Sequence, residues 1–174
     1  MIHKTDFKDL VIIQNKKYKD SRGFFMEILK NKDLKKNFPF VVCSYSKKNV
    51  IRGLHIQTSN PQGKYISVIK GKILDVVVDL RIKSKTFGKH FKIELSEKNS
   101  KSLLIPKGFA HGFLGLEKEN IVLYSNDNYR SQKNEVGILW NDNKLKINWP
   151  KKKLIISKKD NKNISFNQYL KKNS

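Results

Sequence analysis

The sequence predicts an all-β protein built as an antiparallel barrel or sandwich, with only short helices at its periphery. Three observations support this prediction. Apolar and polar residues alternate with a period of two in several stretches, these stretches are short and closely spaced, and no long helical pattern lies between them. Because a parallel α/β sheet needs a helix between successive strands, the pattern favours antiparallel pairing.

The clearest strand is predicted over residues 90–96, where three apolar residues share one face. Residues 64–69 and 73–80 predict a hairpin, because the turn Lys70-Gly71-Lys72 separates two apolar runs. Further strands are expected over residues 10–14, 24–29, 40–46, 51–57, 102–105, 112–116 and 121–125. The strands are short and close together, as in a barrel or sandwich.

Little helix is expected. A short helix is predicted near residues 31–37, and a last helical turn over 168–172. The tail from about residue 152 to 174 is rich in Lys and Asn, so it is predicted to be basic and partly irregular. With 174 residues and 38% hydrophobic composition, the whole chain, 1–174, is predicted to form one domain.

The formal net charge of +22 has two readings. It could indicate a polyanionic partner such as nucleic acid, or a solvated surface rich in lysine. The second is favoured because most of the charge is lysine, no helix-turn-helix, zinc-finger or RRM pattern occurs, and arginine is confined to Arg22, Arg52, Arg81 and Arg130. No nucleic-acid partner is therefore predicted, although a basic surface would attract an anionic diphosphate.

The location is predicted to be cytoplasmic. No run of eighteen apolar residues occurs, so no membrane partner is expected, and the N-terminus shows no apolar signal segment. The single cysteine, Cys43, excludes an internal disulfide. Because Cys43 follows the apolar residues 40–42, it is expected to be buried as a small hydrophobic residue.

Two stretches place polar groups on predicted strands. In an extended strand over residues 52–57, Gly53, His55 and Gln57 share one face. Arg52 lies on the other face, with residues 54 and 56. An inward His beside a Gly leaves room for a ligand, although a lone His is more often structural. Lys64 begins the next strand, and inside a barrel it could stabilise an enolate oxygen.

Two further stretches combine Gly with a charged or ionisable residue. Arg22 precedes Gly23 and a strand, so its guanidinium could bind phosphate, although for this stretch taken alone a turn followed by an apolar strand is the better interpretation. In residues 105–113, Pro106 and Gly108 form a turn that delivers His111 onto a strand. The spacing Pro-x-Gly-x-x-His resembles the second motif of the cupin superfamily, which implies a cupin-type jelly-roll barrel.

Many cupins bind a metal through several histidines and a carboxylate. Here His55 and His111 are widely separated, and Gln57 stands where a second histidine of the first motif would be. Two histidines are too few for a confident transition-metal site. We therefore expect no catalytic metal and no cofactor, which leaves His55 free to act as an acid or a base.

Taken together, the motifs resemble one family of the cupin superfamily, the dTDP-4-dehydrorhamnose 3,5-epimerases. The resemblance covers roughly residues 10–160. It rests on the order and spacing of stretches at residues 22–27, 49–55, 62–64, 75–81, 84–88, 105–113, 123–124, 137–142 and 147–150. It implies an isomerase that inverts C3, C5 or both in a nucleotide-linked 4-keto-6-deoxy sugar, for surface polysaccharide biosynthesis (lipopolysaccharide or capsule).

The resemblance also implies roles for individual residues. His55 corresponds to the base that removes a proton beside the ketone, Tyr124 to the acid on the opposite face, and Asp160 to the carboxylate that pairs with the base. Lys64 corresponds to the lysine near the enolate. Substrate contacts are expected from Arg22, Glu27, Ser44, Arg52, Gln57, His111, Tyr129 and Arg130. Family members are generally homodimers with exchanged N-terminal strands, so residues 10–25 are expected to reach the partner.

The sequence departs from the family at two places. The stretch 42–46 lacks the usual Gln and Asn and offers Ser44 instead, and Arg130 stands where a second tyrosine often contacts the nucleotide. These departures leave the nucleotide open between dTDP and GDP, and the sugar between hexose and heptose. Two other activities stay as alternatives: a sugar-nucleotide 3,4-ketoisomerase on the same fold, and a non-catalytic cupin that binds sugar or nucleic acid.

Overall fold

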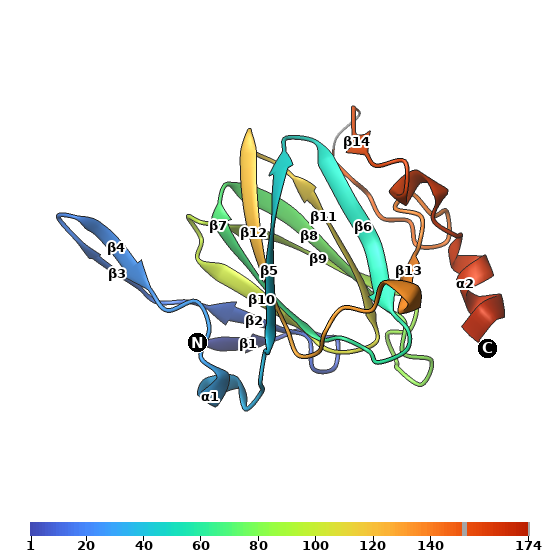
Figure 1. The fold of residues 1–174 in the computed structure, drawn as a ribbon, viewed down its shortest axis with the longest axis horizontal. Helices are drawn as coiled ribbons and strands as arrows, with labels where there is room; N and C mark the ends of the chain where they lie inside the picture. The colour runs from blue at the N-terminus through green and yellow to red at the C-terminus, as the bar shows by residue number, and fades with distance from the viewer. Residues whose placement is uncertain (151–152, 174) are drawn as a thin grey trace.

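The computed structural model describes residues 1–150 and 153–173, and its strands form two large antiparallel sheets (Figure 1). The first sheet has the order β1 (Ile2–Lys4), β2 (Val11–Gln14), β10 (Lys101–Ile105), β7 (Lys64–Lys70), β12 (Glu119–Asn126) and β5 (Phe40–Lys47). The second has the order β13 (Glu135–Gly137), β6 (Val50–Gln57), β11 (Phe109–Gly115), β8 (Lys72–Asp79) and β9 (His90–Ser96), and β14 (Ile155–Ile156) pairs with β6 in parallel.

The sheets pack face to face, and the apolar residues of their inner faces form the core of a jelly-roll barrel. Ile66, Val122 and Leu103 of the first sheet are buried against Val77 and Phe113 of the second. Successive side chains of a strand point to opposite faces of its sheet, so alternate residues of the paired strands face this interior. The predicted cupin-type β-barrel is therefore confirmed.

Most predicted strands match the observed ones, and His90–Ser96 matches at both ends. The predicted hairpin also forms, with Lys70 ending β7, Lys72 beginning β8, and Gly71 between them at φ 82°. A side chain at Gly71 would meet the carbonyl oxygen of Glu119, so the turn requires glycine both for its backbone angle and for space. The predicted helix is shorter than expected, as α1 spans only Asn31–Leu34.

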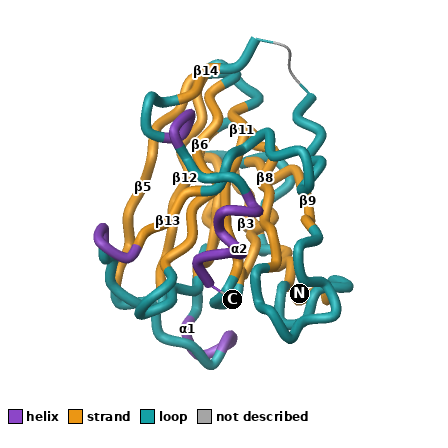
Figure 2. Tube along the Cα trace, turned by 90° about the vertical axis from the view of Figure 1, so that its right-hand side faces the viewer, coloured by secondary structure: helices purple, strands orange, loops and turns teal. Residues whose placement is uncertain are grey.

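The C-terminal tail is more ordered than its composition indicates. It contains β14, a 3-10 turn η2 (Asp160–Lys162) and α2 (Phe166–Asn173), and α2 lies across the outside of the second sheet in Figure 2. Phe166 and Tyr169, three residues apart on α2, are buried against that sheet. The helix predicted over residues 168–172 forms and is longer than expected, because Phe166 and Tyr169 anchor it to the sheet. Residues 151, 152 and 174 lie outside the described part.

The alternation predicted for residues 52–57 is interrupted by a bulge. His55 pairs with His111 and Arg52 pairs with Phe113, so three steps along β6 face two along β11. Gly53 lies inside this bulge with φ 108°, and a Cβ there would meet the backbone of His111. Arg52 was predicted to face away from His55, and this was wrong: the extra residue brings both side chains to the same cavity.

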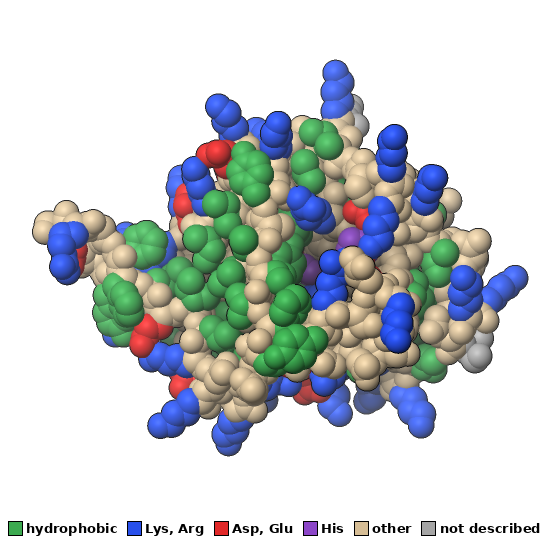
Figure 3. Space-filling model, viewed as in Figure 1, with side chains coloured by type: hydrophobic (Ala, Val, Ile, Leu, Met, Phe, Trp, Pro, Cys, Tyr) green, Lys and Arg blue, Asp and Glu red, His purple; other side chains and the backbone are tan. Residues whose placement is uncertain are grey.

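Cys43 is exposed, which contradicts its predicted burial. It lies on β5, the edge strand of the first sheet, together with Val41 and Tyr45, which are 52% and 49% exposed. Figure 3 shows the hydrophobic surface around this edge. An apolar run predicts burial only where another element covers the strand, and no residue that the structure describes covers the outer face of β5.

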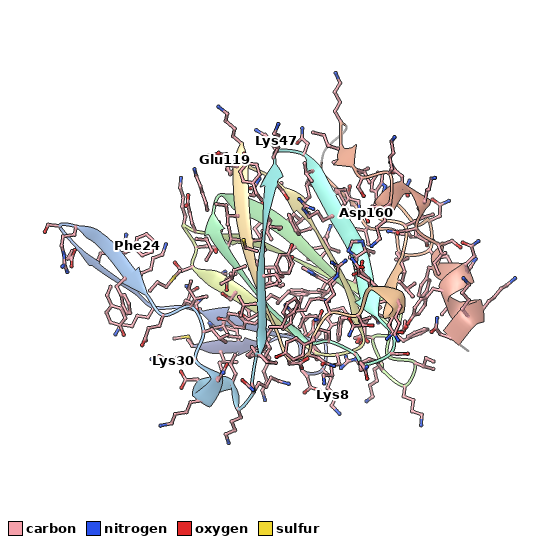
Figure 4. The ribbon with its side chains drawn as sticks, in the orientation of Figure 1. Lys8, Phe24, Lys30, Lys47, Glu119 and Asp160 are labelled. Carbon is pink, nitrogen blue, oxygen red and sulfur yellow. The ribbon has the colours of Figure 1, made fainter. Side chains whose placement is uncertain are left out.

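A hairpin of β3 (Lys17–Asp20) and β4 (Gly23–Met26) extends away from the barrel and is termed the arm below (Figure 1). Its residues Phe24 and Phe25 are 57% and 65% exposed. Figure 4 shows the labelled Phe24 far from the barrel, on the side opposite Asp160. Among the described residues, no helix is both long and apolar enough to span a membrane.

Candidate active site

A cavity of about 690 Å³ opens at one end of the barrel, between the two sheets. Figure 3 shows histidine side chains in a hollow that is flanked by Lys and Arg. The lining combines polar side chains from β5, β6, β7, β11 and β12 with residues of the C-terminal tail. Those that the sequence singled out and the cavity contains are Ser44, Arg52, His55, Gln57, Lys64, His111, Tyr124, Arg130 and Asp160.

His55 and Asp160 form a hydrogen-bonded pair, although 105 positions separate them. The His55 Nε2 atom lies 2.7 Å from Asp160 Oδ1, and Asp160 Oδ2 accepts the backbone N–H of Gly53 at 3.3 Å. The turn η2 presents Asp160, and Figure 4 shows it beside β6. The Asp160 side chain is 5% exposed and that of His55 is 31% exposed, so the histidine faces the cavity with the carboxylate behind it.

The pair fixes which nitrogen of His55 is available. Burial by itself raises the pKa of Asp160, but hydrogen bonds from His55, Gly53 and Ser157 outweigh burial and lower it. An ionised carboxylate only accepts hydrogen bonds, so Nε2 of neutral His55 carries the hydrogen. The lone pair then resides on Nδ1, and His55 can accept a proton there while Asp160 stabilises the resulting charge.

Tyr124 reaches the cavity from the opposite sheet. Its hydroxyl lies 3.1 Å from the Ser44 hydroxyl on the neighbouring strand β5. Burial raises the pKa of Tyr124 well above its usual range, and the hydrogen bond with Ser44 offsets this only in part. Tyr124 is therefore a protonated group at every physiological pH, able to give up a proton only to a strong base such as a carbanion.

Lys64 is a partly buried cation that lines the cavity. Burial lowers its pKa to about 8, and the negative charges of Glu135, Asp127 and Asp75 oppose that shift. Such an ammonium group is weakly hydrated and pairs readily with an anion that develops beside it. His111 also lines the cavity, and its Nε2 lies 2.6 Å from Asp75 Oδ1.

Positive charge gathers near the cavity mouth. Arg52 donates from Nε to Ser46 Oγ at 2.9 Å and from Nη2 to the carbonyl of Tyr45 at 2.9 Å. Arg130 and Lys159 both bind Glu135: Arg130 Nη2 lies 2.9 Å from Oε2, and Lys159 Nζ lies 2.7 Å from Oε1. These three cations offer the donors that a diphosphate requires.

Two predicted contact residues serve mainly to shape the cavity wall. The Gln57 amide donates to the carbonyl of Asn60 at 2.5 Å and accepts the backbone N–H of Ser131 at 2.8 Å, so it fastens two loops. Tyr129 is 63% exposed, and its ring packs on Phe40 with centroids 5.9 Å apart. Phe40, which lines the cavity, is held in place by this contact.

Arg22 and Glu27 do not line the cavity of their own chain. Arg22 lies at the tip of the arm, 88% exposed, and pairs with Asp20 at 2.7 Å. Glu27 follows the arm and pairs with Lys30 at 2.6 Å. The structure thus separates these two predicted residues from the nine that line the cavity, because the arm carries them away from the barrel (Figure 1); Tyr129 does not line the cavity either, but packs on Phe40 at its wall.

Sequence reasoning missed several residues of the cavity. Glu135 and Lys159 form the charged cluster at its mouth, and Gln62 and Asn126 also line it. Glu135 follows a 3-10 turn within a polar stretch, where no periodicity distinguishes it. Lys159 precedes Asp160 in a lysine-rich tail, and only its position beside a candidate catalytic residue could have indicated it. The described residues contain no group of three or more His, Cys, Asp or Glu placed to hold a metal ion.

Comparison with known proteins gives a consistent result. The family model described as dTDP-4-dehydrorhamnose 3,5-epimerase matches residues 4–168. A protein of that name from Shigella flexneri is 41% identical over 164 residues, which is 90% of this chain and 91% of the relative. Its counterpart from Methanothermobacter thermautotrophicus is 42% identical over 165 residues, or 90% of this chain and 89% of the relative.

A solved structure supports the same assignment. The crystal structure of dTDP-4-dehydrorhamnose 3,5-epimerase from Bacillus anthracis, with TDP and pyrophosphate bound, superposes with a TM-score of 0.92 at 40% identity. The match covers 95% of this chain and 99% of that one. Barrel, cavity and sequence agree, and the chain belongs to the dTDP-4-dehydrorhamnose 3,5-epimerase family of isomerases.

Proposed function

We propose that the protein inverts C3 and C5 of a dTDP-linked 4-keto-6-deoxy sugar, with His55 as the base and Tyr124 as the acid. One observation carries this proposal: the two groups face one cavity from opposite sheets, His55 backed by the ionised Asp160 and Tyr124 kept protonated by burial. A base and an acid on opposite sides of a ring are what inversion at carbon requires.

The chemistry needs no redox step. The C4 ketone acidifies the hydrogens on C3 and C5, and Nδ1 of His55 removes one of them. The electron pair of the broken C–H bond moves into the ring, and the charge collects on the C4 oxygen as an enolate. Lys64 stabilises this oxygen as an ammonium group. Tyr124 then donates a proton to the other face of the carbon, which inverts it, and solvent restores both groups.

The proposed nucleotide is dTDP. The structure from Legionella pneumophila, 37% identical over 96% of this chain, is described as a complex with dTDP-4-keto-L-rhamnose, and that from Bacillus anthracis holds TDP. Arg52, Arg130 and Lys159 supply the positive charge for the diphosphate. Calorimetric titration with dTDP and with GDP tests this choice, and tighter binding of GDP would refute it.

The activity is tested by incubating the protein with dTDP-4-keto-6-deoxyglucose and following the sugar by proton NMR. The proposal predicts a product inverted at both C3 and C5. A shift of the keto group to C3 would instead identify a 3,4-ketoisomerase. Absence of turnover, together with binding of DNA that weakens as salt rises, would favour a non-catalytic binding protein.

Lys64 is expected to set the alkaline limit of activity. Its pKa of about 8 means that the ammonium form is present below that pH and is lost above it. We therefore expect kcat to fall as pH rises through about 8, whereas Lys64→Arg, which stays charged, should move the decline to higher pH. The measurement is kcat against pH for both proteins. An unchanged decline in Lys64→Arg would assign it to another group.

We also propose that the protein is a homodimer in which each arm completes the partner's cavity. The arm exposes Phe24 and Phe25, and the outer face of β5 exposes Val41 and Tyr45, so the described residues of one chain leave two apolar surfaces uncovered. Arg22, at the tip of the arm, would then add a cation to the partner's cavity. Sedimentation equilibrium is expected to give about twice the chain mass of 20.3 kDa.

Complementation between two inactive variants tests the exchange of arms. Arg22→Ala lacks the proposed diphosphate contact, and His55→Ala lacks the base. If the arm serves the partner, a mixed dimer contains one intact site, and a co-expressed equal mixture should recover about one quarter of wild-type activity. If Arg22 served its own chain, each site of the mixed dimer would keep one defect and activity would not return.

A further inference from the structure

The barrel contains a second histidine–carboxylate pair, which the proposed mechanism leaves unused. His111 Nε2 lies 2.6 Å from Asp75 Oδ1, and the two side chains are 5% and 0% exposed. They come from the adjacent strands β11 and β8. On its other side, His111 pairs in register with His55 of β6. Two histidines therefore lie side by side, each with its own buried carboxylate.

Asp75 is incompletely satisfied in its pocket. Its Oδ1 atom receives the bond from His111, but its Oδ2 atom is buried and has no hydrogen-bond partner among the described residues. An ionised carboxylate that lacks both water and a partner on one oxygen is costly to bury. A pair that carries one additional proton is neutral overall, so burial favours that form. Burial raises the pKa of Asp75, and the effects of His111 and Lys64 oppose that shift.

His111 is placed to contact a molecule bound in the cavity. His111 lines the cavity, and its ring meets that of Tyr124 edge-on with centroids 6.0 Å apart. The second nitrogen, Nδ1, has no hydrogen-bond partner in residues 1–150 and 153–173. The other ionisable groups that line this cavity are Lys64 of β7, Tyr124 of β12, Arg52 and His55 of β6, and Asp160 behind His55, with Arg130, Glu135 and Lys159 at the mouth.

We propose that Asp75 is a positioning residue that keeps His111 protonated on both ring nitrogens, so that its Nδ1–H donates a hydrogen bond to the oxygen on which the enolate charge develops. This inference rests on the proposed epimerisation. No proton is consumed: the hydrogen bond strengthens as the C–H bond breaks and relaxes when the carbon is reprotonated. His111 thus complements Lys64, and the two histidines divide the work, His55 accepting protons and His111 donating hydrogen bonds.

The direct test is histidine-selective ¹⁵N NMR of the wild-type protein without substrate. The proposal predicts that at neutral pH both ring nitrogens of His111 carry protons, and that Asp75→Asn converts His111 to a neutral ring with one unprotonated nitrogen. The matched control is Asp160→Asn, which should alter the His55 signals and leave those of His111 in place. A wild-type His111 with an unprotonated ring nitrogen at neutral pH would overturn the proposal, whatever the variants do.

Kinetics provide the second readout. In Asp75→Asn, kcat is expected to fall by about 100-fold, while KM changes by less than about threefold, because the lost hydrogen bond matters in the transition state. Wild-type kcat in this variant would refute the positioning role. If the wild-type protein epimerises no sugar, the proposed function fails instead, and the NMR spectrum still decides the protonation of His111.

Discussion

Replacement of His55 with alanine is expected to lower kcat by about 10²–10⁴-fold and to stop exchange of the C3 and C5 hydrogens with solvent. His55 lines the cavity with one ring nitrogen held by Asp160 and the other free to accept a proton, and no other residue is assigned the role of base in this mechanism. The assay is NMR of the sugar during incubation. The account would fail if the alanine variant exchanged these hydrogens at the wild-type rate.

A suitable control for this substitution is His3→Ala. His3 lies on β1, is exposed, and does not line the cavity, so its loss removes a histidine without touching the site. We expect wild-type kcat in this control. Comparison of the two variants separates the effect of the base from any general effect of removing an imidazole.

Replacement of Tyr124 with phenylalanine is expected to separate exchange from inversion. His55 remains, so hydrogens at C3 and C5 should still be removed and replaced by deuterium in D₂O. Without the acid on the opposite face, the proton returns on the side of His55, and the carbon keeps its configuration. We expect the inverted product to form about 10²–10³-fold more slowly, while deuterium enters the substrate.

Tyr65→Phe is the matched control for the second substitution. Tyr65 lies on β7, next to β12, and is 2% exposed, but its hydroxyl donates to the carbonyl of Ile28 at 2.7 Å, outside the cavity. This variant should invert the sugar at the wild-type rate. Inversion in Tyr124→Phe at that same rate would show that another group supplies the proton.

Period-two alternation predicted most of this fold, because a strand with one buried and one solvated face alternates apolar and polar residues along its own sequence. It was accurate at His90–Ser96, where one face contacts the core and the other is solvated. It was misleading around Gly53, because a bulge adds one residue to β6 without any local apolar signal. It also misplaced Cys43, since the burial of an edge strand depends on what covers it rather than on its own residues.

Local sequence patterns predicted less of the site than of the fold. His55 and His111 follow from motifs on strands, but Asp160 was identified only by family resemblance, since its partner lies 105 positions away. Glu135 was missed altogether, although it joins Arg130 and Lys159 at the mouth. Such residues become a group only through tertiary packing, which brings the tail back against β6.

If a cavity histidine and a tyrosine on the opposite sheet invert the sugar through an enolate, the inverted carbons must take up deuterium from solvent. The wild-type protein is incubated in D₂O with dTDP-4-keto-6-deoxyglucose, and the sugar is followed by NMR over time. We expect one deuterium at C3 and one at C5, each appearing with inversion. Binding of the sugar nucleotide without deuterium at either carbon would contradict this mechanism.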